Sequence, residues 1–263
     1  MSDEQPPSGP GAPDPGQSPG AASLPTGLVS AVVSLVNTGP VLLGAYTIAE
    51  LTAVDAIVDF LEARPSDEVL AEAVRSLAAR QLLLAGSTSD QVQVRGDLGI
   101  AVAFQQRARS VLDARATGTE AGEPWRILLL PQPEQICMMV RIDALGVHQI
   151  GLYTMEQALE ILTGWLPTGS SPDGDGDGGD VDADALLAAA ERSALVTVTH
   201  YTAEGSAEIA GESTDVVLSR SDGRLHILTR SAGSPDRLVR TGAQGKDAVH
   251  DRITGLLGQA PAA

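Results

Sequence analysis

The sequence is poor in residue types that usually support specific chemistry. Of its 263 residues, one is cysteine (Cys137), one is lysine (Lys246) and 3% are aromatic. A single cysteine excludes both an intramolecular disulfide and a zinc site built on several cysteines. The low aromatic content predicts a core of Leu, Val, Ile and Ala. The hydrophobic fraction of 43% is enough for one large domain or two small ones.

Positive charge is also scarce. There are 17 Lys and Arg residues against 34 Asp and Glu, so the formal net charge is −17. Because affinity for nucleic acid rests mainly on cationic side chains that neutralise phosphates, we expect no nucleic-acid partner. The same charge balance disfavours an anionic membrane surface.

Long hydrophobic runs are missing as well. The N-terminus is acidic and rich in Pro and Gly, whereas a secretory signal begins basic and continues apolar. The apolar segment Gly27–Gly44 is interrupted at Asn37–Pro40, and it is too short to span a bilayer. We therefore expect a cytoplasmic protein without a membrane span.

The order of predicted elements indicates an α+β protein made of two halves. Residues 125–166 and 195–257 each predict strands followed by a closing helix, β-β-β-α. We expect the halves to be related by a pseudo-twofold axis, each a mainly antiparallel sheet with packed helices. The expected boundaries are a disordered tail (1–26), an N-terminal half (27–166), an Asp/Gly-rich linker (167–182), a C-terminal half (183–258) and a short tail (259–263).

Capping residues predict where several helices begin. Thr47 with Glu50 and Thr154 with Gln157 have capping-box spacing, and Ser66 precedes another helical pattern. The helix that starts at Thr47 is expected to continue to Pro65.

Four further segments complete the N-terminal half. Leu28–Val36 predicts either a strand or a short buried helix, and Val41–Tyr46 an extended piece. Gln91–Arg95 predicts a short strand, and Asp97–Arg115 a third helix.

The segment from Asp173 to Gly178 alternates Asp and Gly. Calcium loops place Asp at positions one, three and five and Gly at position six, which would make Asp173, Asp175, Asp177 and Asp184 the candidate ligands. Asp180 stands where such loops carry an apolar residue. The alternative, which we favour, is a solvated Asp/Gly spacer.

The sequence contains no recognisable catalytic constellation. The four histidines are His148, His200, His226 and His250, and none of them has a metal-binding spacing. The sequence also contains no GxSxG, phosphate-binding or CxxC motif. We expect a protein that is not an enzyme and needs no cofactor.

The helices within Thr47–Leu83, followed by Gln91–Arg95, resemble a winged helix, with AVRSLAARQLL in its second or third helix. DNA binding needs a basic recognition face. Acidic and basic residues are mixed in this helix, so DNA binding is disfavoured, and such a unit would act mainly through contacts with protein.

A methionine pair suggests a possible partner surface. Met138 and Met139 stand beside Cys137 in an apolar strand that also holds Arg141. Methionine adapts its shape to different partners, although it is also common in cores. Met138, Met139 and Arg141 are our candidate partner-binding residues.

Across residues 45–258, the order of segments resembles the EspG family of the mycobacterial and actinobacterial type VII (ESX) secretion systems. The resemblance rests on the phrases AEAVRSLAARQLL, LTGWLP and DGRLHILTR and on the linker between two sets of strands. It implies a cytosolic, acidic, non-enzymatic chaperone with a pseudo-twofold α/β fold, which binds the hydrophobic tip of PPE-type substrates before export. No residue roles carry over, because the family's binding residues form no short motif.

The leading hypothesis is therefore a cytosolic binding protein that masks an apolar, helical, PPE-like partner. The alternative is a regulatory or scaffold protein that contains a winged helix and acts through DNA or protein contacts.

Overall fold

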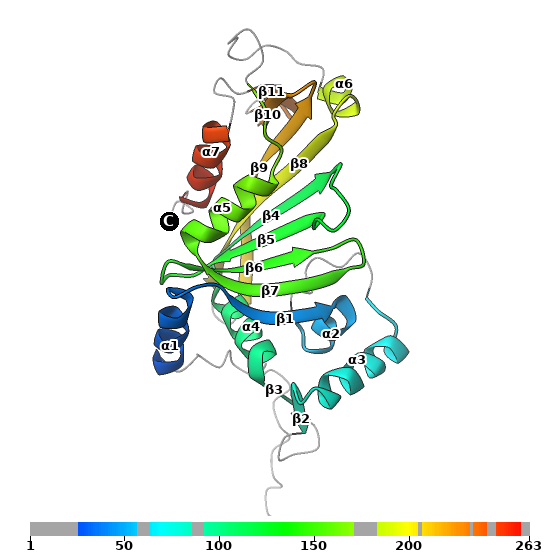
Figure 1. Ribbon diagram of the computed structural model, residues 1–263, viewed down its shortest axis with the longest axis vertical. Helices are drawn as coiled ribbons and strands as arrows, with labels where there is room; N and C mark the ends of the chain where they lie inside the picture. The colour runs from blue at the N-terminus through cyan, green and yellow to red at the C-terminus, as the bar shows by residue number, and fades with distance from the viewer. Residues whose placement is uncertain are drawn as a thin grey trace, which may run out of the picture.

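A single large sheet organises the molecule (Figure 1). The computed structural model describes residues 26–56, 64–85, 92–170, 183–204, 207–231, 234–240 and 246–258. The sheet has nine strands in the order β1-β7-β6-β5-β4-β8-β9-β10-β11, and every neighbouring pair is antiparallel. A separate hairpin is formed by β2 and β3.

The elements follow one another in two series. The first comprises α1 (Thr26–Val36), β1 (Val41–Thr47), α2 (Ile48–Ala53), α3 (Asp67–Ala79), β2 (Leu83–Ala85), β3 (Val92–Val94), α4 (Gly96–Arg107), β4 (Ser110–Thr117), β5 (Arg126–Pro131), β6 (Ile136–Ile142), β7 (Val147–Thr154) and α5 (Met155–Trp165). The second comprises α6 (Ala183–Ala188), β8 (Arg192–Glu204), β9 (Ala207–Ser221), β10 (Arg224–Ser231), β11 (Ser234–Arg240) and α7 (Lys246–Gly258).

The two halves repeat one arrangement of a helix, four strands and a helix. In the first half this is α4, β4 to β7 and α5, and in the second it is α6, β8 to β11 and α7. The first strands of the two repeats, β4 and β8, pair from Ser110↔His200 to Thr117↔Ser193. The prediction of an antiparallel α+β fold in two related halves is confirmed, and this pairing joins the halves into one continuous sheet.

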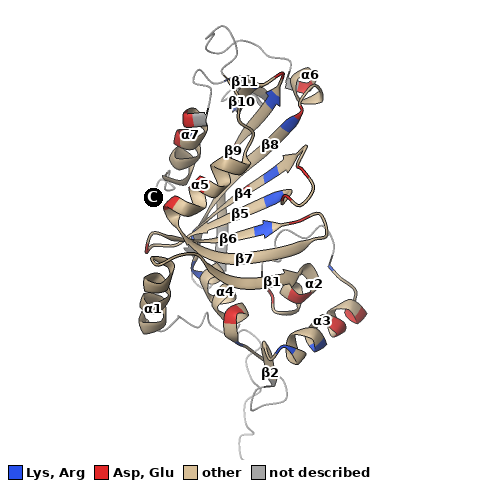
Figure 2. Cartoon of the chain, viewed as in Figure 1, with Lys and Arg blue, Asp and Glu red and all other residues tan. Residues whose placement is uncertain are grey.

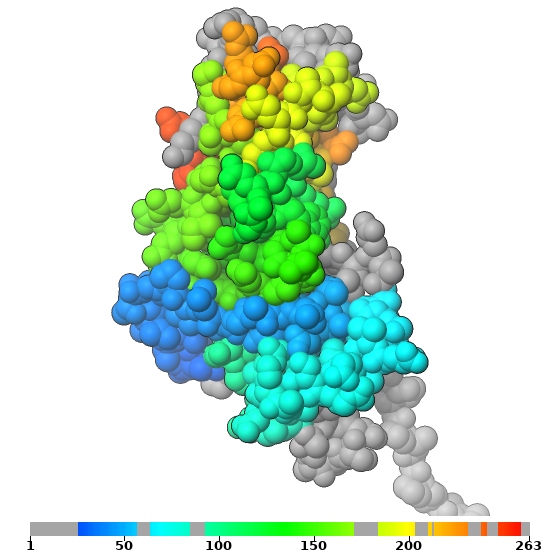
Figure 3. All heavy atoms as spheres, turned by 45° about the vertical axis from the view of Figure 1, so that its right-hand side comes forward, coloured from blue at the N-terminus to red at the C-terminus, as the bar shows by residue number. Residues whose placement is uncertain are grey.

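Helices cover both faces of the sheet. On the first face, α5 and α7 pack over a core that draws on both halves, including Leu129, Met139, Val196 and Ile227. On the second face, α1 and α4 pack over side chains of β5, β6 and β7, with Phe104 of α4 completely buried. Along the long axis of the molecule, α1 to α3 lie at one end, β4 to β7 in the middle and β8 to β11 at the other end (Figure 3).

Side-chain caps start the helices where the sequence predicts them. The Glu50 amide donates to the Thr47 hydroxyl (3.2 Å) while the Thr47 amide donates to the Glu50 carboxylate (2.9 Å). Thr154 and Gln157 form the same reciprocal pair. Ser66 accepts from the amide of Val69. These bonds satisfy N–H groups that the first helical turn leaves without a partner.

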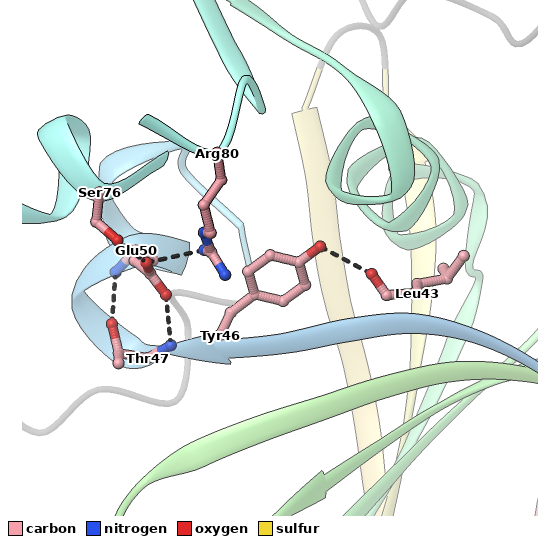
Figure 4. Close-up of polar contacts among 6 residues, drawn as sticks. All are labelled: Leu43, Tyr46, Thr47, Glu50, Ser76 and Arg80. Atoms are coloured by element: carbon pink, nitrogen blue, oxygen red, sulfur yellow. Dashed lines mark hydrogen bonds and ion pairs between the residues drawn. The ribbon is translucent and has the colours of Figure 1, made fainter. Parts of the chain in front are cut away.

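Glu50 also fastens α2 to α3 (Figure 4). Its buried carboxylate accepts from the Ser76 hydroxyl and the Arg80 guanidinium, each at 2.8 Å. The Arg80 guanidinium lies 5.3 Å from the centre of the Tyr46 ring, and the Tyr46 hydroxyl donates to the carbonyl of Leu43. One carboxylate thus links the end of β1 with both helices.

Three sequence predictions need correction. Asp97–Arg115 is not one helix, because α4 ends at Arg107 and β4 begins at Ser110. Each predicted set of three strands has a fourth, β4 in the first half and β11 in the second, and β1 adds one more strand to the sheet of the first half. The helix after Thr47 ends at Ala53, and Asp55 then has a positive φ of 55° that a helix does not accept.

Other predicted segments have simpler outcomes. Leu28–Val36 is helical, which decides between the two alternatives for it. Ser170, near the start of the predicted linker, forms a bridge with Arg224. The predicted tails at 1–25 and 259–263, and residues 171–182 of the linker, lie outside the described residues. None of the described helices is both long and apolar enough to cross a membrane.

Candidate partner-binding groove

Strand β8 separates two kinds of side chain. Ala194, Val196 and Val198 are buried on the first face against α5 and α7. Because successive strand residues point to opposite faces, the residues between them reach the second face. Of these, Leu195 is 36% exposed, an unusual position for a large apolar side chain in the middle of a sheet.

A groove of about 480 Å³ lies over this part of the second face. Its lining comes from β4, β8 and β9, from the residue just before β5, and from α6, β10 and β11. The lining residues are Arg115, Ala116, Thr117, Trp125, Leu187, Ser193, Ala194, Leu195, Val217, Arg230 and Leu238. Its apolar surface comes mainly from Trp125, Leu187, Leu195, Val217 and Leu238. The groove therefore presents a mainly apolar surface.

Trp125 is held in place although 38% of it is exposed. Its indole N–H donates to the carbonyl of Asp143 at 3.0 Å. The guanidinium of Arg126 lies 5.9 Å from the ring. An aromatic side chain that is fixed before binding loses little conformational freedom when a partner arrives, which favours tight contact.

Arginines border the groove. Arg115 and Arg126 lie directly opposite each other on β4 and β5, and the carboxylate of Asp113 accepts hydrogen bonds from both. Arg230 pairs with Asp215, and the Arg230 side chain is 53% exposed. The ends of β8, β4, β5 and β6 form a row of basic positions in Figure 2, at Arg192, Arg115, Arg126 and Arg141. Carboxylates accompany these arginines, because Asp113 pairs with Arg115 and Arg126, and Glu123 pairs with Arg192.

The predicted Met pair is not at the surface. Met138 and Met139 are 0% and 1% exposed, and they point to opposite faces of the sheet. Helices cover both faces at β6, so neither methionine is accessible to a partner. The predicted roles of these two residues are corrected accordingly. Arg141 reaches the surface in part, and its Nε is buried without a hydrogen-bond partner in the described chain.

The buried thiol beside the Met pair is unreactive. Cys137 is completely buried in the core of the first face. Burial raises the pKa of its thiol to about 12, because the apolar surroundings disfavour the thiolate. Since the thiolate is the reactive form, Cys137 offers no nucleophile in the folded protein.

The predicted calcium ligands are not brought together within the described residues. Asp173, Asp175 and Asp177 fall in the segment 171–182, outside the described part of the chain. Asp184 lies exposed on α6. Over the ranges that the structure describes, no three His, Cys, Asp or Glu side chains gather as a metal site would require.

The four histidines lie apart from one another on different elements. His148 and His226 are buried on β7 and β10, whereas His250 is exposed on α7. Burial is the main cause that lowers the pKa of His148 and of His226, and nearby arginines lower both further. Both side chains are therefore neutral at pH 7.

The expected helix pair is present as α2 and α3, and the predicted strand Gln91–Arg95 is present as β3, which pairs with β2. The first turn of α3 is acidic, with Asp67 and Glu68. Arg75 pairs with Glu72, and Arg80 with Glu50. In the described part of this unit, the arginines of α3 are thus neutralised by carboxylates, which is unfavourable for contact with phosphates.

Sequence reasoning missed the groove residues Trp125 and Leu195. An alternating pattern in β8 indicates that one face of this strand is less buried, since small or β-branched apolar residues alternate there with Leu195, Thr197 and Thr199. Trp125 gave no comparable signal, because it precedes β5 and its exposure depends on the neighbouring strands.

Comparison with known proteins leaves the family open. No protein-family model matches the chain, and a search of curated proteins finds no match.

Proposed function

We propose that the protein binds an apolar helical segment of a partner protein in the groove over β4, β8 and β9. The observation that carries the proposal is the exposure of Trp125 and Leu195, which both line a groove of about 480 Å³. A space of this size accepts several apolar side chains from one face of a helix.

The charge distribution supports a role in keeping a partner soluble. The net charge of −17 repels other copies of an acidic complex, which counters aggregation. The groove itself presents apolar side chains and arginines rather than carboxylates. An apolar segment can therefore be covered while the outer surface of the complex stays acidic.

The partner class proposed is a PPE-like substrate of a type VII secretion system, so that the protein acts as a cytosolic chaperone of the EspG type. Support for this class comes from the segment order of the chain and from a fold with two related halves. The chemistry of the groove fits the requirement, since the tip of such a substrate is apolar and helical.

Co-expression with a PE–PPE pair from the same genome tests the proposal. The expected result is that the PPE protein becomes soluble and co-purifies with the chain. Leu195→Glu should reduce co-purification at least tenfold, because a carboxylate in the centre of an apolar contact costs several kcal/mol on burial.

Leu42→Glu is the matched control. Leu42 is a leucine of β1 with 74% exposure, and it is absent from the groove lining. Equal loss of the partner with both variants, or a PPE protein that stays insoluble beside the wild-type chain, would show the proposal to be wrong.

A further inference from the structure

Polar side chains continue the groove along one row of the second face. Across β4, β8, β9 and β10, the pairing places Thr117 opposite Ser193, Ser193 opposite Ser219 and Ser219 opposite His226. Thr117 and Ser193 line the groove, and their hydroxyls bond to each other at 2.8 Å. The row thus leads from the apolar groove toward Ser219 and His226.

The inner end of this row holds polar atoms without partners. Ser219 is 0% exposed and His226 is 9% exposed. Neither Ser219 Oγ nor His226 Nδ1 has a hydrogen-bond partner among the described residues, and the same holds for the buried Nε of Arg240. Unpaired buried polar atoms are costly, so three of them close together indicate a ligand that pairs with them.

The three side chains share one small area. Ser219 and His226 are directly opposite on β9 and β10, which brings their Cβ atoms to about 5 Å. Arg240 lies opposite Leu228, so it is the diagonal neighbour of His226 on the same face, about 7–8 Å away. The charge of Arg240 also lowers the pKa of His226, as expected for groups this close.

The chemistry of this area favours an anion. A hydroxyl, a guanidinium Nε–H and an imidazole N–H can all donate. Residues 224–240 contain four arginines and one acidic residue, Asp236, although acidic residues outnumber basic ones two to one in the whole chain. A carboxylate accepts several hydrogen bonds at once and suits such a set of donors.

We propose that Ser219, His226 and Arg240 form a carboxylate subsite at the inner end of the groove. The ligand then combines an apolar body, which fills the space between Trp125, Leu195 and Leu187, with a carboxylate that reaches under α6. This inference deepens the proposed function and rests on the same groove, because it adds an acidic group to the apolar segment that binds there.

Because α6 contacts β9 and β11, the strands that carry Ser219 and Arg240, we expect a ligand to reach the subsite when this helix shifts. This helix has six residues, and its Leu187 belongs to the groove lining. Leu186 and Leu187 are only half-buried, so a shift of α6 loses little apolar contact.

Titration of the full chain with three probes tests the subsite. Sodium octanoate carries the apolar body and the carboxylate, and 1-octanol carries the body alone. The capped peptide N-acetyl-Leu-Leu-Glu-amide presents the carboxylate as a peptide side chain. Binding is measured by calorimetry, and the ring signals of His226 and His200 are followed by NMR.

Octanoate should bind about tenfold or more tightly than octanol, since a charge-assisted hydrogen bond is added. It should also raise the pKa of His226, whereas the ring signals of His200 should not move on binding. Tighter binding of the peptide than of octanoate identifies a protein segment as the source of the carboxylate, and the reverse order identifies a free carboxylic acid.

Variants distinguish binding of the carboxylate in the subsite from binding of the apolar body in the groove. Arg240→Gln should remove the advantage of octanoate over octanol, and Ser219→Ala should reduce it several-fold. Arg75→Gln and Ser30→Ala, on α3 and α1, are the matched controls and should change neither affinity. Leu195→Glu should weaken both probes.

Two results would overturn the subsite. One is equal affinity for octanoate and octanol in the wild-type chain, including the absence of binding for both. The other is an unchanged octanoate advantage in Ser219→Ala and in a folded Arg240→Gln. Failure of the chaperone proposal gives a different pattern: the PPE protein does not co-purify, while the octanoate advantage and its loss in Arg240→Gln remain.

Discussion

The second face of the sheet is covered by a long helix over one half of the molecule and is partly exposed over the other. In the first half, α4 has twelve residues and places Leu98, Ala101 and Phe104 in a core with β5, β6 and β7. In the second half, the corresponding helix α6 has six residues, and Leu195 remains 36% exposed beneath the groove. The same arrangement of strands thus yields either a core or a binding surface, and the length of one helix decides which.

The largest effect on the free energy of unfolding is expected from a cavity in the core of the closed half. Phe104 is completely buried, so Phe104→Ala should lower the free energy of unfolding by about 3–5 kcal/mol. Leu187→Ala, on the helix of the open half, should cost about 1 kcal/mol or less. Urea unfolding monitored by circular dichroism measures both. Similar losses for the two variants would mean that α6 closes a core of its own.

A second contrast concerns ion pairs near the centre of the sheet and near its far end. Asp113 pairs with the buried Arg126, so Asp113→Asn leaves that arginine uncompensated and should cost about 3 kcal/mol. Asp215 pairs with the more exposed Arg230, and Asp215→Asn should cost under about 1 kcal/mol. Urea unfolding at low and high salt checks the order, which salt should not reverse.

The outer layer of the closed half provides the third test. Glu50→Ala removes a helix cap and the partner of Ser76 and Arg80, and should cost about 2 kcal/mol. Glu72→Ala on α3 breaks an exposed pair with Arg75 and should cost under about 0.5 kcal/mol. Thermal unfolding compares the two. If Glu72→Ala were as harmful as Glu50→Ala, the contacts of Glu50 would not explain the attachment of α3.

The smallest effect is expected from pH. Burial lowers the pKa of both His148, in the closed half, and His226, in the open half, so the unfolded chain takes up protons more readily than the folded protein. Stability should therefore fall as the pH drops below about 6.5, the ordinary value for histidine. Replacing either residue by Gln should flatten this part of the profile, measured by urea unfolding at several pH values. His250→Gln, at an exposed position, should leave it unchanged.

Local signals in the sequence predicted helix starts and most strands of the fold. Thr47, Ser66 and Thr154 cap their helices because the relevant bonds join residues three apart, which is visible in the sequence. Strand β4 was missed because Ala108–Arg115 has no strong strand signal of its own. It is extended because β5 and β8 pair with it on either side, and those partners lie far away in the chain.

The candidate site was harder to predict for a related reason. Met138 and Met139 belong to an apolar strand, and burial on both faces could not be distinguished from a surface pair without knowing which helices cover β6. Leu195 is exposed because α6 is short and ends at Ala188. In both cases the answer depends on coverage by another element rather than on the residues themselves.

The pairing of β4 with β8 has a consequence for how the protein folds. This pairing joins Ser110 with His200, and the core of the first face contains side chains from both halves. Contacts between residues so distant in the chain form slowly, because a long loop must close before they are made. The nine strands should then unfold in a single cooperative transition, so that neither half persists when the other is lost.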